Sequence, residues 1–97
     1  MRVRWTSRAK SQLLELSAWI ARERPMTAKR LVRRLRRATA AIGENPLSGR
    51  VIPEFRDPSL RERLVSPYRI LYSVQSDVFI LAIYDGRRLL PEDPEDL

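Results

Sequence analysis

The chain has 97 residues and a formal net charge of +7, and it contains neither Cys nor His. Disulfide bonds, thiolate or imidazole metal sites, a cysteine nucleophile and every histidine-dependent triad are therefore excluded, and we expect neither a metal nor a cofactor. The length fits one small domain with little stability to spare, for which a partner that completes the core is plausible.

The folded body is more basic than the total charge indicates. Leaving out the four acidic residues of the C-terminal tail raises the formal charge from +7 to +11 for residues 1–91 (Glu92, Asp93, Glu95 and Asp96). Seventeen of the nineteen cations are Arg, whose planar guanidinium pairs well with carboxylate or phosphate. Anionic partners follow, either nucleic acid or an acidic protein surface. For any single Arg, simple solvation of the surface is the alternative.

The N-terminal half predicts a short strand and a helical hairpin. Residues 2–5 are β-prone, and Thr6 or Ser7 is a candidate N-cap for a helix that ends before Pro25, with apolar residues spaced four, three and four apart (Ala9, Leu13, Leu16 and Ile20). Thr27 is a candidate cap for a second helix, which stops at Gly43 and whose apolar residues recur every three or four positions (Ala28, Leu31, Leu35, Ala38 and Ile42).

The other face of the second predicted helix is a cationic stripe, formed by Lys29, Arg30, Arg33, Arg34, Arg36 and Arg37. No aromatic side chain is interleaved with these cations, as would be typical of a surface that stacks on bases. A solvated face is therefore favoured over a nucleic-acid-binding helix. We likewise expect Trp5 and Trp19 to be core or helix-packing aromatics rather than stacking platforms.

The C-terminal half predicts strands. Residues 50–55 look extended, and Pro53 within them indicates a sheet edge or a bulge. Residues 60–65 and 68–74 follow, and the second of these alternates so as to have one fully buried side. Residues 78–84 are a continuous apolar run, typical of a central strand covered on both faces. Residues 89–97 are rich in acid and proline, so we expect a tail with little structure of its own that could fold over the basic body.

These elements predict an α+β fold. The order is an N-terminal strand, a two-helix hairpin, and three or four mostly antiparallel strands, with the helices packed on one face of the sheet. We expect a single domain at residues 1–91 and an acidic tail at residues 92–97. Neither a signal-peptide pattern nor a membrane-spanning run is present, so we expect a cytoplasmic protein.

Taken in order, these features resemble the RelE/ParE superfamily of type II toxins over nearly the whole chain. The matching residues are Trp5 and Thr6 before the first helix, Asn45, Pro46, Gly49 and Arg50 after the second, then Glu54, Leu60, Arg61, Glu62, Tyr68, Arg69, Ile70 and Tyr72, with Gly86 and Arg87 closing the last strand. The resemblance implies a growth-inhibiting toxin and a co-encoded antitoxin whose C-terminal segment wraps it. A basic, Arg-rich sheet face would suit an acidic segment that folds on binding.

Two activities occur in this superfamily. RelE-like members cleave mRNA on the ribosome without a metal, using cationic residues and, in many members, a late Tyr or His for proton transfer. Arg61, Arg63, Arg69 and Arg87 match the basic positions of that branch. ParE-like members poison DNA gyrase, trap the cleaved-DNA complex and have no catalytic residues.

The end of the chain favours the ParE-like reading. Residues 85–97 contain no Tyr, His or Lys, so a group for proton transfer is missing, and with it the roughly 100-fold to 10,000-fold that such a group contributes. Tyr84 is the only late aromatic, and a packing role is favoured because it ends an apolar strand. The sequence from Leu60 to Tyr72 also looks more like ParE than RelE.

The candidate residues for target or antitoxin binding are Arg50, Arg61, Arg63, Arg69, Tyr84, Arg87 and Arg88. Arg69 is either an ion-pair partner of Glu54 or Glu62, or part of an exposed functional surface. Arg61 and Arg63 should share one sheet face, where charge pairing across strands competes with a binding role. Of Arg50, Arg87 and Arg88, one is expected to bind. A third hypothesis is a non-toxic nucleic-acid-binding module, which the net charge supports.

Overall fold

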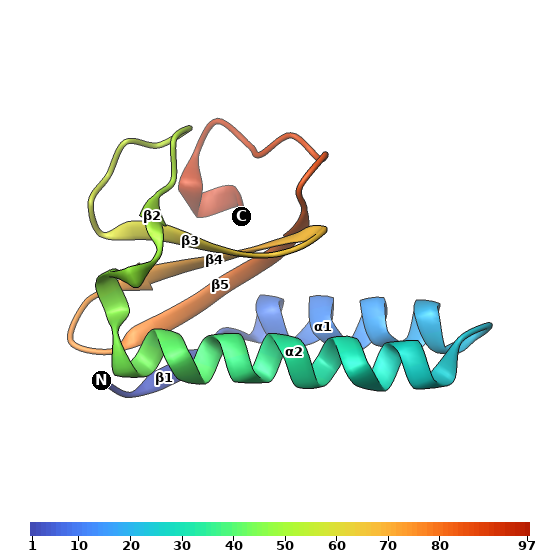
Figure 1. Cartoon of the computed structure of the whole chain (residues 1–97). Helices are drawn as coiled ribbons and strands as arrows, with labels where there is room; N and C mark the ends of the chain where they lie inside the picture. The colour runs from blue at the N-terminus through green and yellow to red at the C-terminus, as the bar shows by residue number, and fades with distance from the viewer.

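The computed structural model describes all 97 residues and places five strands and two helices in two layers (Figure 1). The order is β1 (Val3–Trp5), α1 (Ser7–Ala21), α2 (Pro25–Glu44), β2 (Arg50–Val51), β3 (Leu60–Val65), β4 (Tyr68–Val74) and β5 (Val78–Asp85), with 3-10 turns η1 (Pro46–Ser48) and η2 (Pro94–Asp96). The sheet order is β1-β5-β4-β3-β2. Only β1 and β5 pair in parallel. The predicted α+β fold with its helical hairpin is confirmed.

Helix α1 begins where the sequence indicates, because Thr6 caps it. The Thr6 hydroxyl accepts a hydrogen bond from the Ala9 amide at 3.1 Å and so satisfies one of the free N–H groups of the first turn. The predicted apolar stripe faces the sheet, with Ala9 fully buried. Trp19 is 69% exposed and stacks under the Arg22 guanidinium. The expectation that Trp19 is a core or helix-packing aromatic is wrong. Trp19 precedes Ile20 by one residue, so its side chain points about 100° away from the apolar stripe that faces the sheet.

The start of α2 differs from the prediction. The helix begins at Pro25 rather than after a Thr27 cap, and no side chain caps it. Proline is well placed at the first helical position, where its missing N–H would have had no partner and its fixed φ already matches the helix. The two helices are consequently joined by a connection of only three residues, and they lie side by side beneath the sheet (Figure 1).

The end of α2 also differs, because Gly43 lies inside the helix, which continues to Glu44. A Cβ on Gly43 would lie 2.7 Å from a Val3 methyl group and 2.9 Å from the Met1 carbonyl oxygen. Glycine is therefore required at this position by the close approach of the N-terminal strand, and not by a turn at the end of the helix.

The strands match the sequence best where they are long. The expected edge position of the strand that begins at Arg50 is confirmed, but β2 ends at Val51 and Pro53 lies in the turn that follows. The expected central strand β5 has a neighbour on each side, yet the middle of the sheet is β4. Strand β1 covers only the first residues of β5. Beyond it the Thr6 hydroxyl donates to the Leu81 carbonyl at 3.3 Å, and the Gln12 side chain accepts from the Ile83 amide at 2.8 Å.

The sheet is covered on both faces. The larger core lies between the sheet and the helices, where Leu35, Ile42, Ile70, Tyr72 and Ile80 are fully buried. A second, smaller core lies on the other face and consists of Ile52, Leu71, Ala82, Tyr84 and Leu97. Strand β4 is thus buried on both sides, whereas the alternation predicted one fully buried side. Neither helix combines the length and the apolar character needed to cross a membrane.

The second core exists because the C-terminal residues return over the sheet (Figure 1). Turn η2 is capped by the Asp93 carboxylate, which accepts from the Glu95 amide at 2.9 Å, and Leu97 is only 5% exposed. These residues therefore have more structure than the sequence led us to expect. The division of the chain into a domain at 1–91 and a tail at 92–97 stays a prediction.

Candidate functional site

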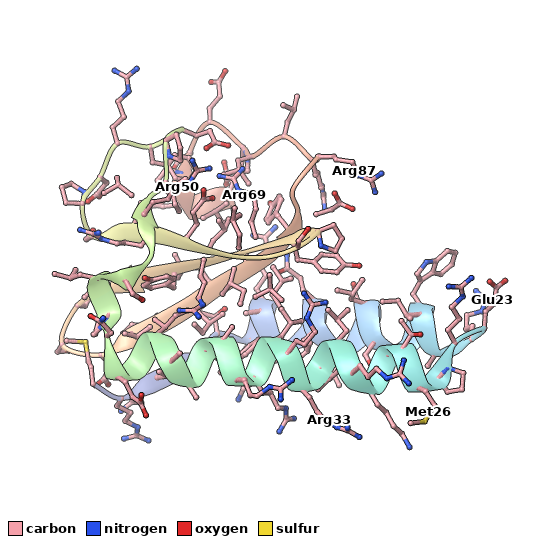
Figure 2. The ribbon with its side chains drawn as sticks, viewed as in Figure 1. Glu23, Met26, Arg33, Arg50, Arg69 and Arg87 are labelled. Atoms are coloured by element: carbon pink, nitrogen blue, oxygen red, sulfur yellow. The ribbon has the colours of Figure 1, made fainter.

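A network of two arginines and two glutamates lies on the sheet face opposite the helices. Strands β2, β3 and β4 place Arg50, Glu62 and Arg69 on this face, because residues that pair directly across antiparallel strands point to the same side, and Arg50 pairs with Glu62. Figure 2 shows Arg50 and Arg69 above the sheet, away from α1 and α2. Glu54 joins them from the turn after β2.

Arg69 is the centre of this network. Its Nε donates to Glu62 Oε2 at 2.5 Å, and its two terminal nitrogens donate to the Glu54 carboxylate at 2.8 and 2.9 Å in a bidentate pair. The Glu62 side chain is completely buried and also accepts a hydrogen bond from Arg50 Nε. All four formal charges therefore cancel within the network. Of the two roles proposed for Arg69, the structure shows the ion pair, and Arg69 contacts both Glu54 and Glu62.

The electrostatics agree with this geometry. The hydrogen bonds from Arg69 lower the pKa of Glu54 below its ordinary value, against the opposing effect of burial. The same contacts with Glu54, followed by those with Glu62, raise the pKa of Arg69 above its ordinary value. A guanidinium held by two carboxylates has little positive potential left for a phosphate. Arg69 is consequently a support of the surface rather than a free contact residue.

Arg50 is the member of the network that remains available. Its side chain is 63% exposed, and it uses only its Nε in the pair with Glu62. A pocket of about 380 Å³ opens beside it, between the β3–β4 turn and the end of β5, and it is lined by Arg50, Glu54, Leu64, Ser66, Pro67, Tyr68, Arg69 and Gly86. Leu64 is 61% exposed at the rim. The pocket thus offers an outward guanidinium edge beside an apolar side chain.

Arg61 and Arg63 lie on the opposite face of the sheet. They pair across the strands with Tyr72 and Ile70, which belong to the core under the helices. The expectation that the two arginines share a face is therefore confirmed. Arg61 donates to the Pro58 and Gly49 carbonyls at 3.0 and 3.1 Å, so it fastens the loops on both sides of β2. Arg63 is half-buried in the same row.

The end of β5 holds the remaining candidates. Arg87 donates to the Asp85 carboxylate from its Nε at 3.1 Å and from Nη2 at 2.9 Å, and these contacts lower the pKa of Asp85 to about 2. The Arg88 guanidinium lies 5.0 Å above the centre of the Tyr84 ring, within the range of a cation–π contact. Tyr84 itself is 5% exposed and belongs to the second core. Arg88 is the exposed partner in this pair.

Sequence reasoning missed the role of the Tyr72 hydroxyl. It donates to the Pro46 carbonyl at 2.8 Å and accepts from the Gly49 amide at 3.0 Å. A Cβ on Gly49 would lie 2.4 Å from that hydroxyl oxygen. The turn that carries Arg50 is therefore fixed to the middle of the sheet. The alternation of β4 indicated a buried Tyr72, but no local pattern indicates the partner of its hydroxyl.

A second concave surface lies on the helical layer. It is an apolar groove of about 390 Å³, lined by Trp5, Leu13 and Leu14, with Lys10 and Arg36 at its edges. Leu14 is 70% exposed. No group of three or more Asp or Glu side chains anywhere in the chain is placed to hold a metal ion.

Comparison with known proteins gives a family model, a curated relative and solved structures that match. Residues 3–90 match the family model of the ParE toxin of the type II toxin-antitoxin system parDE. The chain is 38% identical over 93 residues to "Putative toxin Y4kP" of Sinorhizobium fredii, and the match covers 94% of each chain. It is also similar to a chain of a structure described as the chromosomal ParDE TA system from P. aeruginosa, with a TM-score of 0.73 and 20% identity over 88% of this chain and 95% of that one. The structural likeness supports the fold alone.

Proposed function

This chain belongs to the ParE toxin family of type II toxin-antitoxin systems, and we propose that it inhibits growth by poisoning DNA gyrase as a binding protein without catalytic residues. A toxin of such a system has a cognate antitoxin. We further propose that the antitoxin is co-encoded, that its C-terminal segment wraps this chain, and that the two form a hetero-oligomer in the cytoplasm.

The observation that carries the gyrase proposal is the scattering of the arginines that an RNase would need. Arg61 and Arg63 lie on one face of the sheet, and Arg69 lies on the other, where two carboxylates neutralise it. Arg87 is paired with Asp85. Cleavage of RNA requires cations and an acid or base held together around one phosphate. This arrangement supports an inhibitor that acts by binding.

The surface around the β2–β3–β4 pocket supports a contact with the target. Arg50 and Arg88 present exposed guanidinium groups on the face opposite the helices, and Leu64 adds an apolar anchor between the strands. Arginine is enriched among the residues that dominate protein–protein affinity. We therefore propose Arg50, Leu64 and Arg88 as target contacts, with Arg61, Arg69 and Tyr84 supporting them from below.

The apolar groove at Trp5, Leu13 and Leu14 supports the antitoxin proposal. Its cationic edges, Lys10 and Arg36, complement an acidic amphipathic segment whose apolar residues would fill the groove. A segment that is disordered when free and folds on binding suits such a surface. Arg36 belongs to α2 and Lys10 to α1, so one segment would contact both helices.

The proposal is tested by expressing the chain from a tightly controlled promoter without its partner. Growth, induction of the DNA-damage response and mRNA integrity are scored in the same cells, and purified gyrase is assayed for accumulation of cleaved DNA. We expect growth arrest, DNA damage and intact mRNA. Ribosome-dependent cuts in mRNA without DNA damage would establish the RNase alternative, and unaffected growth would leave only a non-toxic module.

Two variants connect this experiment to the surface. The double substitution Arg50→Ala and Leu64→Ala should abolish the gain of cleaved DNA while the circular dichroism spectrum stays unchanged. The matched control changes Arg8→Ala and Leu14→Ala, which lie on the helical layer away from the pocket, and should leave gyrase poisoning intact. Equal loss in both variants would contradict the proposed contact surface.

A further inference from the structure

The exposed face of α2 carries positive charge that nothing in the chain neutralises. Between residues 29 and 37 every exposed position is cationic, and no exposed position is apolar or acidic (Lys29, Arg30, Arg33, Arg34, Arg36 and Arg37). None of these six takes part in an ion pair; only Arg34 has a polar partner outside its own helix, the Ser66 carbonyl at 3.2 Å. We call this surface the α2 cationic face.

This arrangement weakens the isolated helix. Arg33 has like charges three and four residues away on both sides, at Lys29, Arg30, Arg36 and Arg37. Each such pair costs about 0.2 to 0.5 kcal/mol on a helix surface. The only acid in α2 is Glu44 at its C-terminal end, which does not relieve the crowding. A partner with a row of negative charges along the helix would offset this repulsion.

The shape of the face limits which negatively charged partner can bind it. It is the outer side of α2, and Figure 2 shows Arg33 pointing away from the sheet. The six cations span about 12 Å along the axis at 1.5 Å per residue. An acidic peptide that folds on binding needs apolar residues to bury. Of the six cations only Arg36 borders an apolar groove, and the exposed positions between residues 29 and 37 offer no apolar side chain. A partner with regular charge and no apolar requirement fits better.

We propose that the α2 cationic face binds the phosphate backbone of duplex DNA. Duplex DNA carries a negative charge about every 1.7 Å along its axis, and binding gains free energy from counterions that the cations displace. Five of the six cations are Arg, whose fork takes phosphate oxygens in bidentate fashion. Because the face presents no side chain suited to reading base edges apart from these cations, the binding is independent of sequence. This inference holds whether or not gyrase is the target.

The test measures binding of the full chain, made by cell-free synthesis, to a short fluorescein-labelled DNA duplex. Fluorescence anisotropy gives the affinity from about 50 to about 200 mM salt. The variant Arg30→Gln, Arg33→Gln and Arg37→Gln keeps helix propensity and removes three charges from the face. We expect binding at least tenfold weaker at about 50 mM salt, and a log–log salt slope that is shallower by about 2.7.

The matched control removes three exposed charges elsewhere, with Arg2→Gln, Arg8→Gln and Arg56→Gln, so that both variants have the same net charge. We expect its slope to change by less than about 1. The corresponding triple Lys variant of the α2 cationic face should keep most of the affinity, with unchanged circular dichroism. Equal weakening in the control and the Gln variant would attribute binding to net charge and overturn the proposal. Displacement of the duplex by a polyglutamate peptide more readily than by unlabelled duplex would also overturn it, in favour of an acidic protein partner.

Discussion

The Arg–Glu network on the sheet and the α2 cationic face are both rich in arginine, yet the charges are neutralised in the first and not in the second. On the sheet, Glu62 and Glu54 neutralise Arg69, and the three side chains are held by hydrogen bonds of 2.5 to 2.9 Å. On α2, six neighbouring cations are exposed and none of them forms an ion pair. Net charge and composition describe both regions in the same way, and only the placement of a few glutamates separates them.

The difference teaches that an arginine count is a poor guide to a binding surface. A buried guanidinium must be paired, because an unpaired charge in a low-dielectric surrounding is costly. Such an arginine is committed to the fold. An exposed arginine among like charges gives little to the fold and keeps its donors for another molecule. The sheet network therefore supports the surface, and the α2 cationic face is free to bind.

The largest expected effect comes from breaking the neutralised region. Glu62→Gln keeps the size of the side chain but leaves Arg69 with one carboxylate and Arg50 with none. We expect a loss of about 3 kcal/mol in the free energy of unfolding, measured by urea denaturation. Glu54→Gln is the control, because the Glu54 side chain is 40% exposed and should cost less than about 1 kcal/mol. Equal costs would contradict the expectation that the buried carboxylate shared by Arg50 and Arg69 matters more than the exposed one.

A smaller effect tests whether uncharged hydrogen bonds also hold the turn that carries Arg50. Tyr72→Phe leaves the Pro46 carbonyl and the Gly49 amide without their partner, and we expect a loss of about 1 to 3 kcal/mol. The loss should be the same at low and high salt, since no charge is involved. Tyr68→Phe, at the half-buried start of β4, should change stability by less than about 0.5 kcal/mol. A Tyr72 effect that disappears in salt would show the reasoning to be wrong.

The cationic region should respond with the opposite sign. Arg33→Gln removes one member from four like-charge pairs, so we expect the free energy of unfolding to rise by roughly 0.8 to 2 kcal/mol at low salt. The gain should fade as salt screens the charges. Urea denaturation at two ionic strengths checks both points. A destabilised Arg33→Gln protein would mean that the helix depends on this side chain.

The smallest expected effect is the pH dependence that Glu54 contributes to stability. The pKa of Glu54 is lower in the folded chain than its ordinary value of 4.5. Its contribution is therefore fully present well above pH 4.5 and is lost as the pH falls through the lower folded pKa. Asp85 titrates in the same direction, with a folded pKa of about 2. The Glu54 share is isolated as the difference between wild type and Glu54→Gln, which should shrink as the pH falls; a difference that grows would have the wrong sign.

Local patterns predicted the elements of this fold because each pattern has its own period. The Thr6 cap, the apolar stripe of α1 and the alternation of residues 68–74 depend on neighbours within about four residues. The cap, the stripe and the strand itself are confirmed, but the strand at residues 68–74 is buried on both sides and not on one. The ends of α2 were wrong because Pro25 starts a helix without a side-chain cap, and because Gly43 serves packing against β1.

Of the candidate site, the sequence indicated the right pairs but not their geometry. An ion pair with Glu54 or Glu62 is one of the two roles that the sequence predicts for Arg69, and the strand alternation predicts Arg61 and Arg63 on one face. Arg61 donates hydrogen bonds to the Gly49 and Pro58 carbonyls, which lie in the loops on the two sides of β2. Local sequence patterns cannot predict these contacts, because they join residues that only the fold brings together.

By itself the sequence determined the order of the elements and the membership of this protein in a toxin family, because local spacing and residue order need no third dimension. The tertiary structure alone decided which arginines are neutralised and which are free. That decision depends on burial and on carboxylates that arrive from other strands, and the cost of burying an unpaired charge makes those long-range contacts, rather than the local sequence, fix the role of each arginine.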